Sequence, residues 1–164
     1  MPLLISQFKS PIGVINLIAD EHILLGLNLS SIKALKDGVD EVDYAKGFTE
    51  VSKIAVISDL LSDYFAGDID AINGISVRQP GAQFSQAAWK VMRKVKAGKT
   101  LSYADLADRS GSTAAVRAAG SACAKNAIAL VVPCHRIVKT GGALGNYAYG
   151  LSKKEWLLRH EGAL

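Results

Sequence analysis

The sequence predicts an α/β protein of two subdomains, with a small antiparallel sheet in residues 1–80 and a mainly helical part in residues 81–164. Three observations predict this division. The first thirty residues are short apolar runs separated by turn residues, which is typical of strands. Glycine and proline gather near residues 78–83, where a boundary is expected. Beyond it, apolar residues recur at helical spacing behind capping residues.

The N-terminal subdomain begins with three predicted strands. Their sequences are LLISQF at 3–8, VINLIA at 14–19 and ILLGLNL at 23–29. The turns SPIG and DEH between them are short, so an antiparallel meander is the simplest arrangement. Residues 30–50 are polar and irregular and receive no predicted function. Helical spacing predicts a helix over 52–65, and residues 68–83 are interpreted as a strand followed by a linker.

Two capping serines predict the first helices of the C-terminal subdomain. Ser85, flanked by Phe84 and Trp89 at the staple positions, is the expected N-cap of one helix. Ser102 is expected to open a short helix over 103–110.

A third helix is predicted to start at Thr113, so that two helices follow one another with a short break, as in a helix-turn-helix. Its side chains are unusually small, as Ala114, Ala115, Ala118, Ala119, Gly120, Ser121 and Ala122 show. Two interpretations stay open. The helix packs tightly against a neighbouring helix, or it enters the minor groove of DNA with Arg117 as its one long side chain.

The last helix is predicted over 153–162 from a hydrophobic staple and a capping box. These are formed by Leu151, Ser152, Glu155 and Trp156. Gly162 is the expected stop, which places Glu161 at a frayed end rather than on a buried face. The preceding loop, KTGGALGNYAYG, can present backbone amides and an aromatic wall to a ligand.

The composition narrows the class of protein. With 164 residues, 49% hydrophobic and 21% charged, the chain has the balance of a soluble globular protein. It has no apolar run of membrane-spanning length and no signal peptide, so a cytoplasmic location is expected. The two cysteines, Cys123 and Cys134, are expected to stay free thiols, and without a CxxC or HxxxH pair no zinc site is expected.

Positive charge is concentrated in the second half of the chain. The net charge is +4, and between residues 89 and 160 the only acidic residues among many lysines and arginines are Asp105, Asp108 and Glu155. This asymmetry indicates that the C-terminal part meets phosphate groups, as in double-stranded DNA.

The stretch VVPCHRIV at 131–138 places a thiol beside an imidazole in an apolar run. A cysteine is most often simple packing, but a neighbouring histidine can make Cys134 a nucleophile. Adjacent residues of a strand point to opposite faces, so Cys134 and His135 meet only if the backbone bends at Pro133 or a water bridges them. Glu161 and Glu155 are the candidate carboxylates for holding the imidazole.

Several segments together resemble the methylated-DNA protein-cysteine S-methyltransferases, which repair 6-O-alkylguanine. They are LSYADLA around Tyr103, VRAAG around Arg117, AKNA around Asn126, VPCHRIV at 132–138, and GALGNYAYGL followed by KKEWLLRHEG. The resemblance is strong over residues 84–162. The first eighty residues match only generically, through SPIGVINLIA.

The resemblance implies a ribonuclease H-like N-terminal subdomain and a helix-turn-helix. It also implies an irreversible, single-turnover transfer of a methyl or alkyl group to Cys134 after the damaged nucleotide flips out of duplex DNA. The lesion is 6-O-alkylguanine, with 4-O-alkylthymine as a further candidate. No cofactor is implied, and the protein is expected to act as a monomer.

The resemblance also implies roles for individual residues. Cys134 matches the alkyl acceptor, His135 the base that deprotonates it through water, and Glu161 the carboxylate that orients His135. Asn126 matches the residue that steadies the turn, and Tyr103 the one that protonates the departing guanine. The implied DNA-binding residues are Ser102, Tyr103, Ser112, Ala115, Arg136 and Arg117, the last filling the space that the nucleotide leaves. The implied pocket residues are Val132, Gly145, Tyr147, Ala148 and Lys154.

Two other functions compete with alkyl transfer. A cysteine hydrolase or acyltransferase would use Cys134, His135 and Glu161, and it would need an oxyanion hole and turn over many times. A DNA-binding regulator would use the helix-turn-helix to recognise sequence, with the thiol incidental or a redox sensor. The predicted recognition helix is poor in polar side chains for contacting base edges.

Overall fold

Two units make up the chain in the computed structural model, which describes all residues from 1 to 164. Unit 1 is Met1–Pro80 with Ala127–Val131, and unit 2 is Gly81–Asn126 with Val132–Leu164. None of the helices is both long enough and apolar enough to cross a lipid bilayer.

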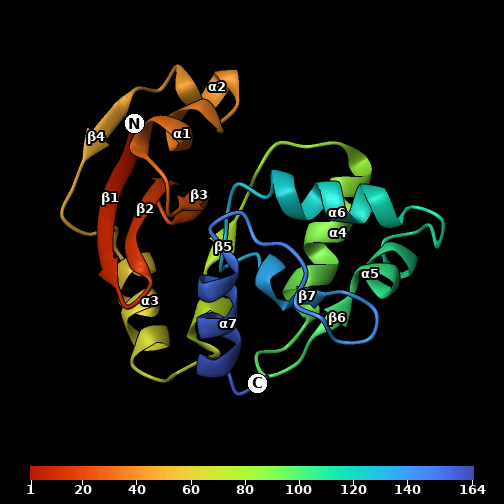
Figure 1. The fold of residues 1–164 in the computed structure, drawn as a ribbon. Helices are drawn as coiled ribbons and strands as arrows, with labels where there is room; N and C mark the ends of the chain where they lie inside the picture. Colours follow the sequence, from red (N-terminus) through yellow and green to blue (C-terminus); the bar gives the residue numbers. More distant parts are fainter. The chain divides into compact units, whose positions relative to one another are not determined.

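Unit 1 is built on a five-stranded sheet (Figure 1). Its strands are β1 Leu3–Ser10, β2 Gly13–Asp20, β3 Ile23–Asn28, β4 Phe48–Glu50 and β5 Ser76–Val77. The order across the sheet is β4-β1-β2-β3-β5. Strands β1, β2 and β3 are antiparallel, which confirms the predicted meander, whereas β4 and β5 run parallel to their neighbours.

The segment Ala127–Val131 belongs to unit 1 although it lies in the predicted C-terminal subdomain. It pairs with β3, because the Leu27 amide donates to the Ala127 carbonyl at 2.9 Å and the Ala129 amide donates to the Leu27 carbonyl at 3.1 Å. The chain therefore passes through unit 1 just before it reaches Cys134.

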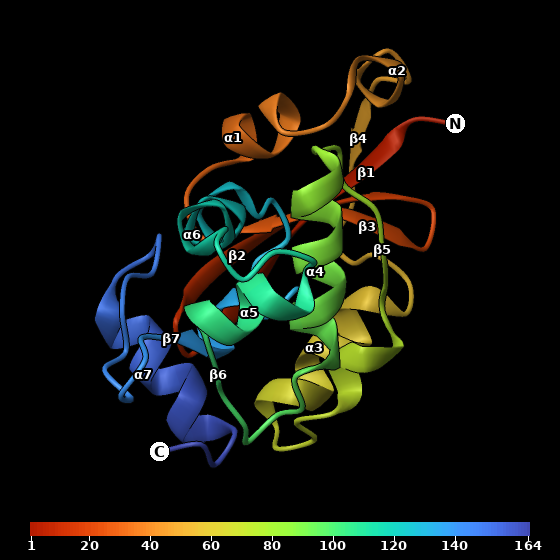
Figure 2. The ribbon, with the colours of Figure 1, turned by 90° about the vertical axis from the view of Figure 1, so that its right-hand side faces the viewer.

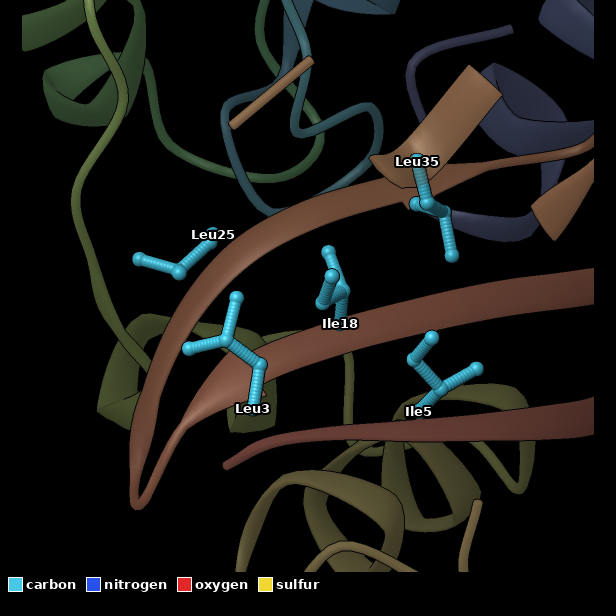
Figure 3. Close-up of a cluster of buried hydrophobic side chains, with 5 residues drawn as sticks. All are labelled: Leu3, Ile5, Ile18, Leu25 and Leu35. Atoms are coloured by element: carbon cyan, nitrogen blue, oxygen red, sulfur yellow. The ribbon is translucent and has the colours of Figure 1, made fainter. Parts of the chain in front are cut away.

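Buried aliphatic side chains hold the sheet and the first helix together (Figure 3). The cluster contains Leu3 and Ile5 of β1, Ile18 of β2, Leu25 of β3 and Leu35 of α1, which spans Ile32–Asp37. Full burial of one such side chain contributes about 1.5–3 kcal/mol, so this cluster is a main source of the stability of unit 1.

Residues 30–50 are not irregular, so that prediction is wrong. They form α1, the short helix α2 at Glu41–Tyr44, and β4. Side-chain caps start both helices, since Ser31 Oγ accepts from the Ala34 amide at 3.1 Å and Asp40 Oδ1 accepts from the Asp43 amide at 2.8 Å. Elements this short leave too few apolar positions for a periodic pattern to show.

Helix α3 spans Ile57–Phe65 and begins later than the predicted Ser52. The Ile57 amide donates to the Ala55 carbonyl at 2.8 Å, and Val56 between them has a φ of 70°. This three-residue turn redirects the chain just before the helix. A 3-10 turn, η1 at Ala71–Gly74, then leads into β5.

Unit 2 is mainly helical. Its helices are α4 Gln83–Lys94, α5 Tyr103–Arg109, α6 Val116–Lys125 and α7 Leu151–His160. Helices α4, α5 and α6 pack against one another (Figure 2), and the Trp89 indole of α4 donates to the Ala122 carbonyl of α6 at 2.9 Å. Strands β6 Leu101–Ser102 and β7 Ile137–Val138 form a parallel pair, and the 3-10 turn η2 at Cys134–Arg136 precedes β7.

Helix α5 begins as predicted, with Ser102 Oγ accepting from the Asp105 amide at 3.0 Å. The predicted cap at Ser85 is wrong, because α4 begins at Gln83 behind Ala82 without a side-chain cap. The predicted start at Thr113 is also wrong. Its hydroxyl donates to Asp108 at 2.8 Å instead, and α6 begins at Val116.

The capping box predicted at Ser152 does not form. Helix α7 begins at Leu151 behind Gly150, whose φ of 102° brings the chain into the helix through a conformation that favours glycine. Glu155 pairs instead with Arg159 one turn later, at 2.8 Å.

Candidate active site

The turn that carries Cys134 is not the strand that alternation predicts. The Cys134 amide donates to the Val132 carbonyl at 2.8 Å around Pro133, whose φ of −82° and ψ of 68° are those of an inverse γ-turn. The 3-10 turn η2 follows at once. Cys134 and His135 are therefore freed from the opposite-face rule of a strand.

Asn126 clamps this turn from the end of α6. Its Nδ2 donates to the same Val132 carbonyl at 2.8 Å, so that oxygen accepts from both Asn126 and Cys134. A hydrogen bond from Asn126 also lowers the pKa of the Cys134 thiol. The position of the sulfur thus depends on a side chain that ends a helix rather than on the turn alone.

His135, Arg136 and Glu161 form a buried ionic cluster. His135 Nε2 lies 2.9 Å from Glu161 Oε2, and Arg136 donates through Nε to Oε1 and through Nη2 to Oε2, both at 2.9 Å. The remaining Arg136 nitrogen, Nη1, donates to the Val95 carbonyl at 2.7 Å. Glu161 is 3% exposed, so the predicted frayed, exposed position is wrong.

The protonation states of this cluster follow from burial and pairing. Burial would raise the pKa of Glu161, but its bonds to His135 and Arg136 lower it to about 2. Burial lowers the pKa of His135 despite the neighbouring carboxylate. A neutral His135 must then donate from Nε2 to Glu161, which leaves Nδ1 as the basic nitrogen. This Nδ1 is buried and has no hydrogen-bond partner in the protein.

Opposing effects act on the pKa of the buried Cys134 thiol. Burial raises the pKa of the thiol, while Asn126 and the positive charge of Lys154 lower it. The Lys154 ammonium is buried and donates to the carbonyls of Ile137 at 2.6 Å and Asn146 at 3.1 Å. The net shift is upward, so Cys134 rests as a thiol at neutral pH and needs a base when it reacts.

Two tyrosines near the sulfur stay protonated. Burial, followed by the charges that Cys123 and Cys134 would carry as thiolates, raises the pKa of Tyr103 to about 12. Burial also raises the pKa of Tyr147, whose hydroxyl is buried without a partner. Both side chains are therefore available as proton or hydrogen-bond donors.

A cavity of about 650 Å³ opens beside these groups within unit 2. Its lining residues are Tyr103, Val116, Arg117, Gly120, Ser121, Cys123, Ala124, Cys134, Lys139, Asn146, Tyr147 and Ala148. Cavities that hold small-molecule ligands have volumes of about 300–1,000 Å³. The cavity can therefore hold a small ligand beside the Cys134 thiol, with the Tyr103 hydroxyl as a candidate proton donor in the same lining.

Comparison with known proteins identifies the family. Residues 83–163 match the family model described as the DNA binding domain of 6-O-methylguanine DNA methyltransferase. The methylated-DNA–protein-cysteine methyltransferase of Salmonella typhimurium is 34% identical over 166 residues, which cover 99% of this chain and 97% of that protein. The chain belongs to the methylated-DNA–protein-cysteine methyltransferase family. The Methanosarcina acetivorans member is 35% identical, over 95% of this chain and 96% of its own.

Solved structures of this family share the fold. The crystal structure of Mycobacterium tuberculosis OGT in complex with DNA has a TM-score of 0.80 and 29% identity, covering 98% of this chain and 93% of that one. The O6-methylguanine methyltransferase of the same organism has a TM-score of 0.77 at the same identity and coverage.

In this methyltransferase, the residues predicted for catalysis lie together in unit 2. Asn126 clamps the turn of Cys134, His135 pairs with Glu161, and Tyr103 lines the same cavity as Cys134. Of the predicted pocket residues, Tyr147 and Ala148 line the cavity. Val132, Gly145 and Lys154 do not line it, but each contacts a residue that does. The Val132 carbonyl accepts from the Cys134 amide, Gly145 lies against Tyr103, and Lys154 donates to the Asn146 carbonyl.

Gly145 shows how such support works in the methyltransferase fold. Its φ is 76°, and a Cβ atom there would come within 3.1 Å of Tyr103 Cε2 and 3.5 Å of Lys139 Cγ. A glycine is needed on both counts, because the backbone conformation disfavours other residues and the Tyr103 ring lies close above it.

Apart from Tyr103, which lines the cavity, the predicted DNA-binding residues of the methyltransferase separate into three groups. Arg117 is exposed, has a side chain at the cavity, and belongs to the second helix of the α5–α6 pair. Ser112 and Ala115 lie in the connection between these helices, and Ser102 caps α5. Arg136 is 2% exposed and bound to Glu161, so the prediction that it contacts DNA is wrong.

Sequence reasoning missed part of the cavity wall of the methyltransferase. The unpredicted residues include Cys123, Lys139, Asn146 and several positions of α6. The α6 positions recur every three or four residues, from Val116 to Gly120 and Ala124, which is one helix face. That periodicity was present in the sequence, but small residues give it little hydrophobic contrast.

The small residues on α6 differ in burial, and only the buried ones pack against neighbouring parts of the protein. Ala119 and Ala122 are buried, whereas Ala118, Ser121 and Ala124 are exposed. A Cβ atom added at Gly120 would meet no atom within 4 Å. Helix packing therefore explains the buried alanines of this methyltransferase, and it does not explain the slender outer face.

Proposed function

We propose that this protein repairs 6-O-alkylguanine in duplex DNA by direct transfer of the alkyl group to Cys134. One observation supports this function above the others. The Cys134 thiol lines a cavity large enough for a nucleobase. The next residue, His135, is held by the buried Glu161 carboxylate through Nε2, so its Nδ1 is left as the basic nitrogen. Membership of the methyltransferase family provides the reaction class, and the residues provide the steps.

The nucleophile is activated by proton transfer at the moment of reaction. A water molecule between Cys134 and Nδ1 of His135 carries the thiol proton to the imidazole. The imidazolium that forms is stabilised by Glu161, which remains ionised because its pKa is about 2. The thiolate exists only within an apolar pocket, where it is strongly nucleophilic.

The leaving base is protonated from the opposite side. The thiolate sulfur attacks the alkyl carbon, a carbon–sulfur bond forms, and the bond from that carbon to the base oxygen breaks. Tyr103 donates a proton to the base as negative charge develops there, since its hydroxyl stays protonated up to a pH of about 12. The same steps apply to 4-O-alkylthymine, in which the exocyclic oxygen on C4 bears the alkyl group.

DNA binds through the α5–α6 pair, which acts as a helix-turn-helix in the minor groove. A base inside a duplex cannot be reached by a protein sulfur, so the damaged nucleotide must be flipped out. The slender outer face of α6 suits close approach to the groove, and Arg117 at its start fills the space left in the stack. Unit 2 carries the complete set of these groups, so we expect a monomer to act, with the ribonuclease H-like unit 1 as scaffold.

The transfer is irreversible and occurs once per protein molecule. The product is a thioether, which is stable, and no residue of the cavity offers a route to cleave it. A cysteine hydrolase with the same three residues would release its product and continue.

Stoichiometry separates these two functions. A duplex carrying one labelled 6-O-methylguanine is added in increasing excess over the protein, and the repaired DNA is counted after the reaction stops. Repair should stop at one lesion per protein molecule. Repair of many lesions per molecule, with methanol released to solution, would instead identify a hydrolase.

A further inference from the structure

The cavity is lined by two cations and by no carboxylate. Arg117 lies on α6, and Lys139 lies on the loop that follows β7. The first already has a task in the proposed function, as the side chain that replaces the flipped nucleotide. Lys139 has none, although a lysine at the mouth of a cavity with no neighbouring acid is a binding group for an anion.

A tight turn fixes the base of Lys139. Its amide donates to the Ala143 carbonyl at 2.9 Å, and its carbonyl accepts from the Gly142 amide at 3.0 Å. Both Lys139 and Tyr103 lie against Gly145. A Cβ atom at Gly145 would be 3.5 Å from Lys139 Cγ and 3.1 Å from Tyr103 Cε2. The lysine is thus positioned relative to Tyr103, which is part of the reaction site.

The ammonium group of Lys139 is not occupied by another part of the protein. The residue is exposed, and it belongs to none of the ion pairs of the chain. The acidic side chains of unit 2 pair elsewhere or lie outside the cavity, as Glu155 and Glu161 do with Arg159 and Arg136. An anion can therefore bind the Lys139 ammonium without breaking an existing ion pair.

We propose that Lys139 binds a backbone phosphate next to the flipped nucleotide and so holds the damaged base in the cavity. When a base rotates into a cavity, its sugar and flanking phosphates stay at the entrance. A cation at the cavity entrance can bind them, and Lys139 is exposed and lines the cavity. The inference rests on the proposed function, because it requires a nucleotide to enter this cavity.

The test compares a substrate that has phosphates with one that has none. The Lys139→Gln variant is reacted with a duplex containing 6-O-methylguanine and with the free base 6-O-methylguanine, and binding to the undamaged and the damaged duplex is measured over a range of salt concentrations. Lys139→Arg keeps the charge. Lys99→Gln removes another exposed lysine of unit 2, one that does not line the cavity.

One lost phosphate contact has a defined signature. The Lys139→Gln variant should bind the damaged duplex about 5- to 10-fold more weakly at ~0.1 M salt, with a salt slope reduced by about 0.9. Transfer from the duplex should slow correspondingly, transfer from the free base should stay unchanged, and Lys139→Arg should keep the original slope. The effect should be larger for the damaged than for the undamaged duplex, because only a flipped nucleotide brings its phosphate to the entrance.

Other results would overturn the assignment. An unchanged salt slope, or a change equal to that of Lys99→Gln, would show that Lys139 makes no specific phosphate contact. An equal loss with the free base would show that Lys139 shapes the cavity instead. If the unmodified protein takes no alkyl group from duplex DNA, the proposed function itself fails and the role of Lys139 fails with it. If the unmodified protein does take the alkyl group from duplex DNA, the proposed function stands, and the results with Lys139→Gln decide only the role of Lys139.

Discussion

Nε2 of His135 lies 2.9 Å from Oε2 of Glu161, and both side chains are shielded from solvent. The carboxylate determines which nitrogen of the neutral imidazole is protonated, and it leaves Nδ1 as the basic nitrogen. It also neutralises Arg136, so one acidic side chain holds both His135 and Arg136 in place.

Replacing Glu161 with glutamine keeps the shape of the side chain and removes its charge. The variant should transfer alkyl groups roughly 10²-fold more slowly, because the imidazolium formed from His135 loses its counter-charge. It should also lose about 3 kcal/mol of unfolding free energy, since Arg136 is left buried without an anion. Transfer kinetics and urea unfolding measure the two effects. Glu155→Gln, an exposed partner of Arg159, should change neither, and an equal effect there would contradict the assignment.

Acid should weaken the fold in two steps. The pKa of His135 is lowered in the folded protein, so its contribution is present above the ordinary value of 6.5 and is lost as the pH falls below it. The pKa of Glu161 is lowered from 4.5 to about 2, so its contribution is complete above about 4.5 and is lost between there and 2. Urea midpoints between pH 7 and pH 3 should therefore fall, and Glu161→Gln should lack the lower step. Equal midpoints at pH 7 and pH 4 would contradict this.

Loss of the Tyr103 hydroxyl should slow the chemical step and leave DNA binding intact. Tyr103→Phe cannot protonate the leaving base, so the single-turnover rate at saturating DNA should fall by about 10²-fold. Affinity for the damaged duplex should change little. Tyr44→Phe, an exposed change in unit 1, serves as the control. A Tyr103→Phe protein with weaker binding but an unchanged maximal rate would assign the residue to binding instead.

Arg117→Ala should affect flipping rather than chemistry. Without a side chain to fill the stack, transfer from a fully paired duplex should slow by about tenfold. The loss should be smaller when the lesion lies opposite a gap, because less pairing must be broken. Transfer from the free base should be unaffected. The same tenfold loss on all three substrates would place Arg117 in the chemical step.

Local patterns predicted the meander and the cap of α5, because their determinants lie within a few residues of one another. The strands alternate with short turns, and Ser102 caps a helix that begins at the next residue. The α4, α6 and α7 caps were wrong because other backbone geometry was available nearby, such as the positive φ of Gly150 before α7. Competing local solutions are not distinguished by residue type alone.

The site depended more on contacts distant in sequence. Glu161 is separated from His135 by 26 residues and from Arg136 by 25, so no local pattern could show that it is buried. Residue types left Glu161 and Glu155 as two candidate partners of His135, and only the resemblance to the family chose Glu161, while the predicted helix end placed it in solvent. The same cluster explains why Arg136 is not at the protein surface, since its guanidinium pairs with Glu161.

The central claim is that the Cys134 sulfur itself keeps the alkyl carbon. It is tested by incubating the protein with a duplex that carries isotope-labelled 6-O-methylguanine, followed by mass analysis of the peptide that contains Cys134. That peptide should gain the mass of one labelled methyl group, the Cys123 peptide should gain none, and Cys134→Ser should leave the DNA unrepaired. Full repair by Cys134→Ser, or repaired DNA without label on Cys134, would contradict the claim.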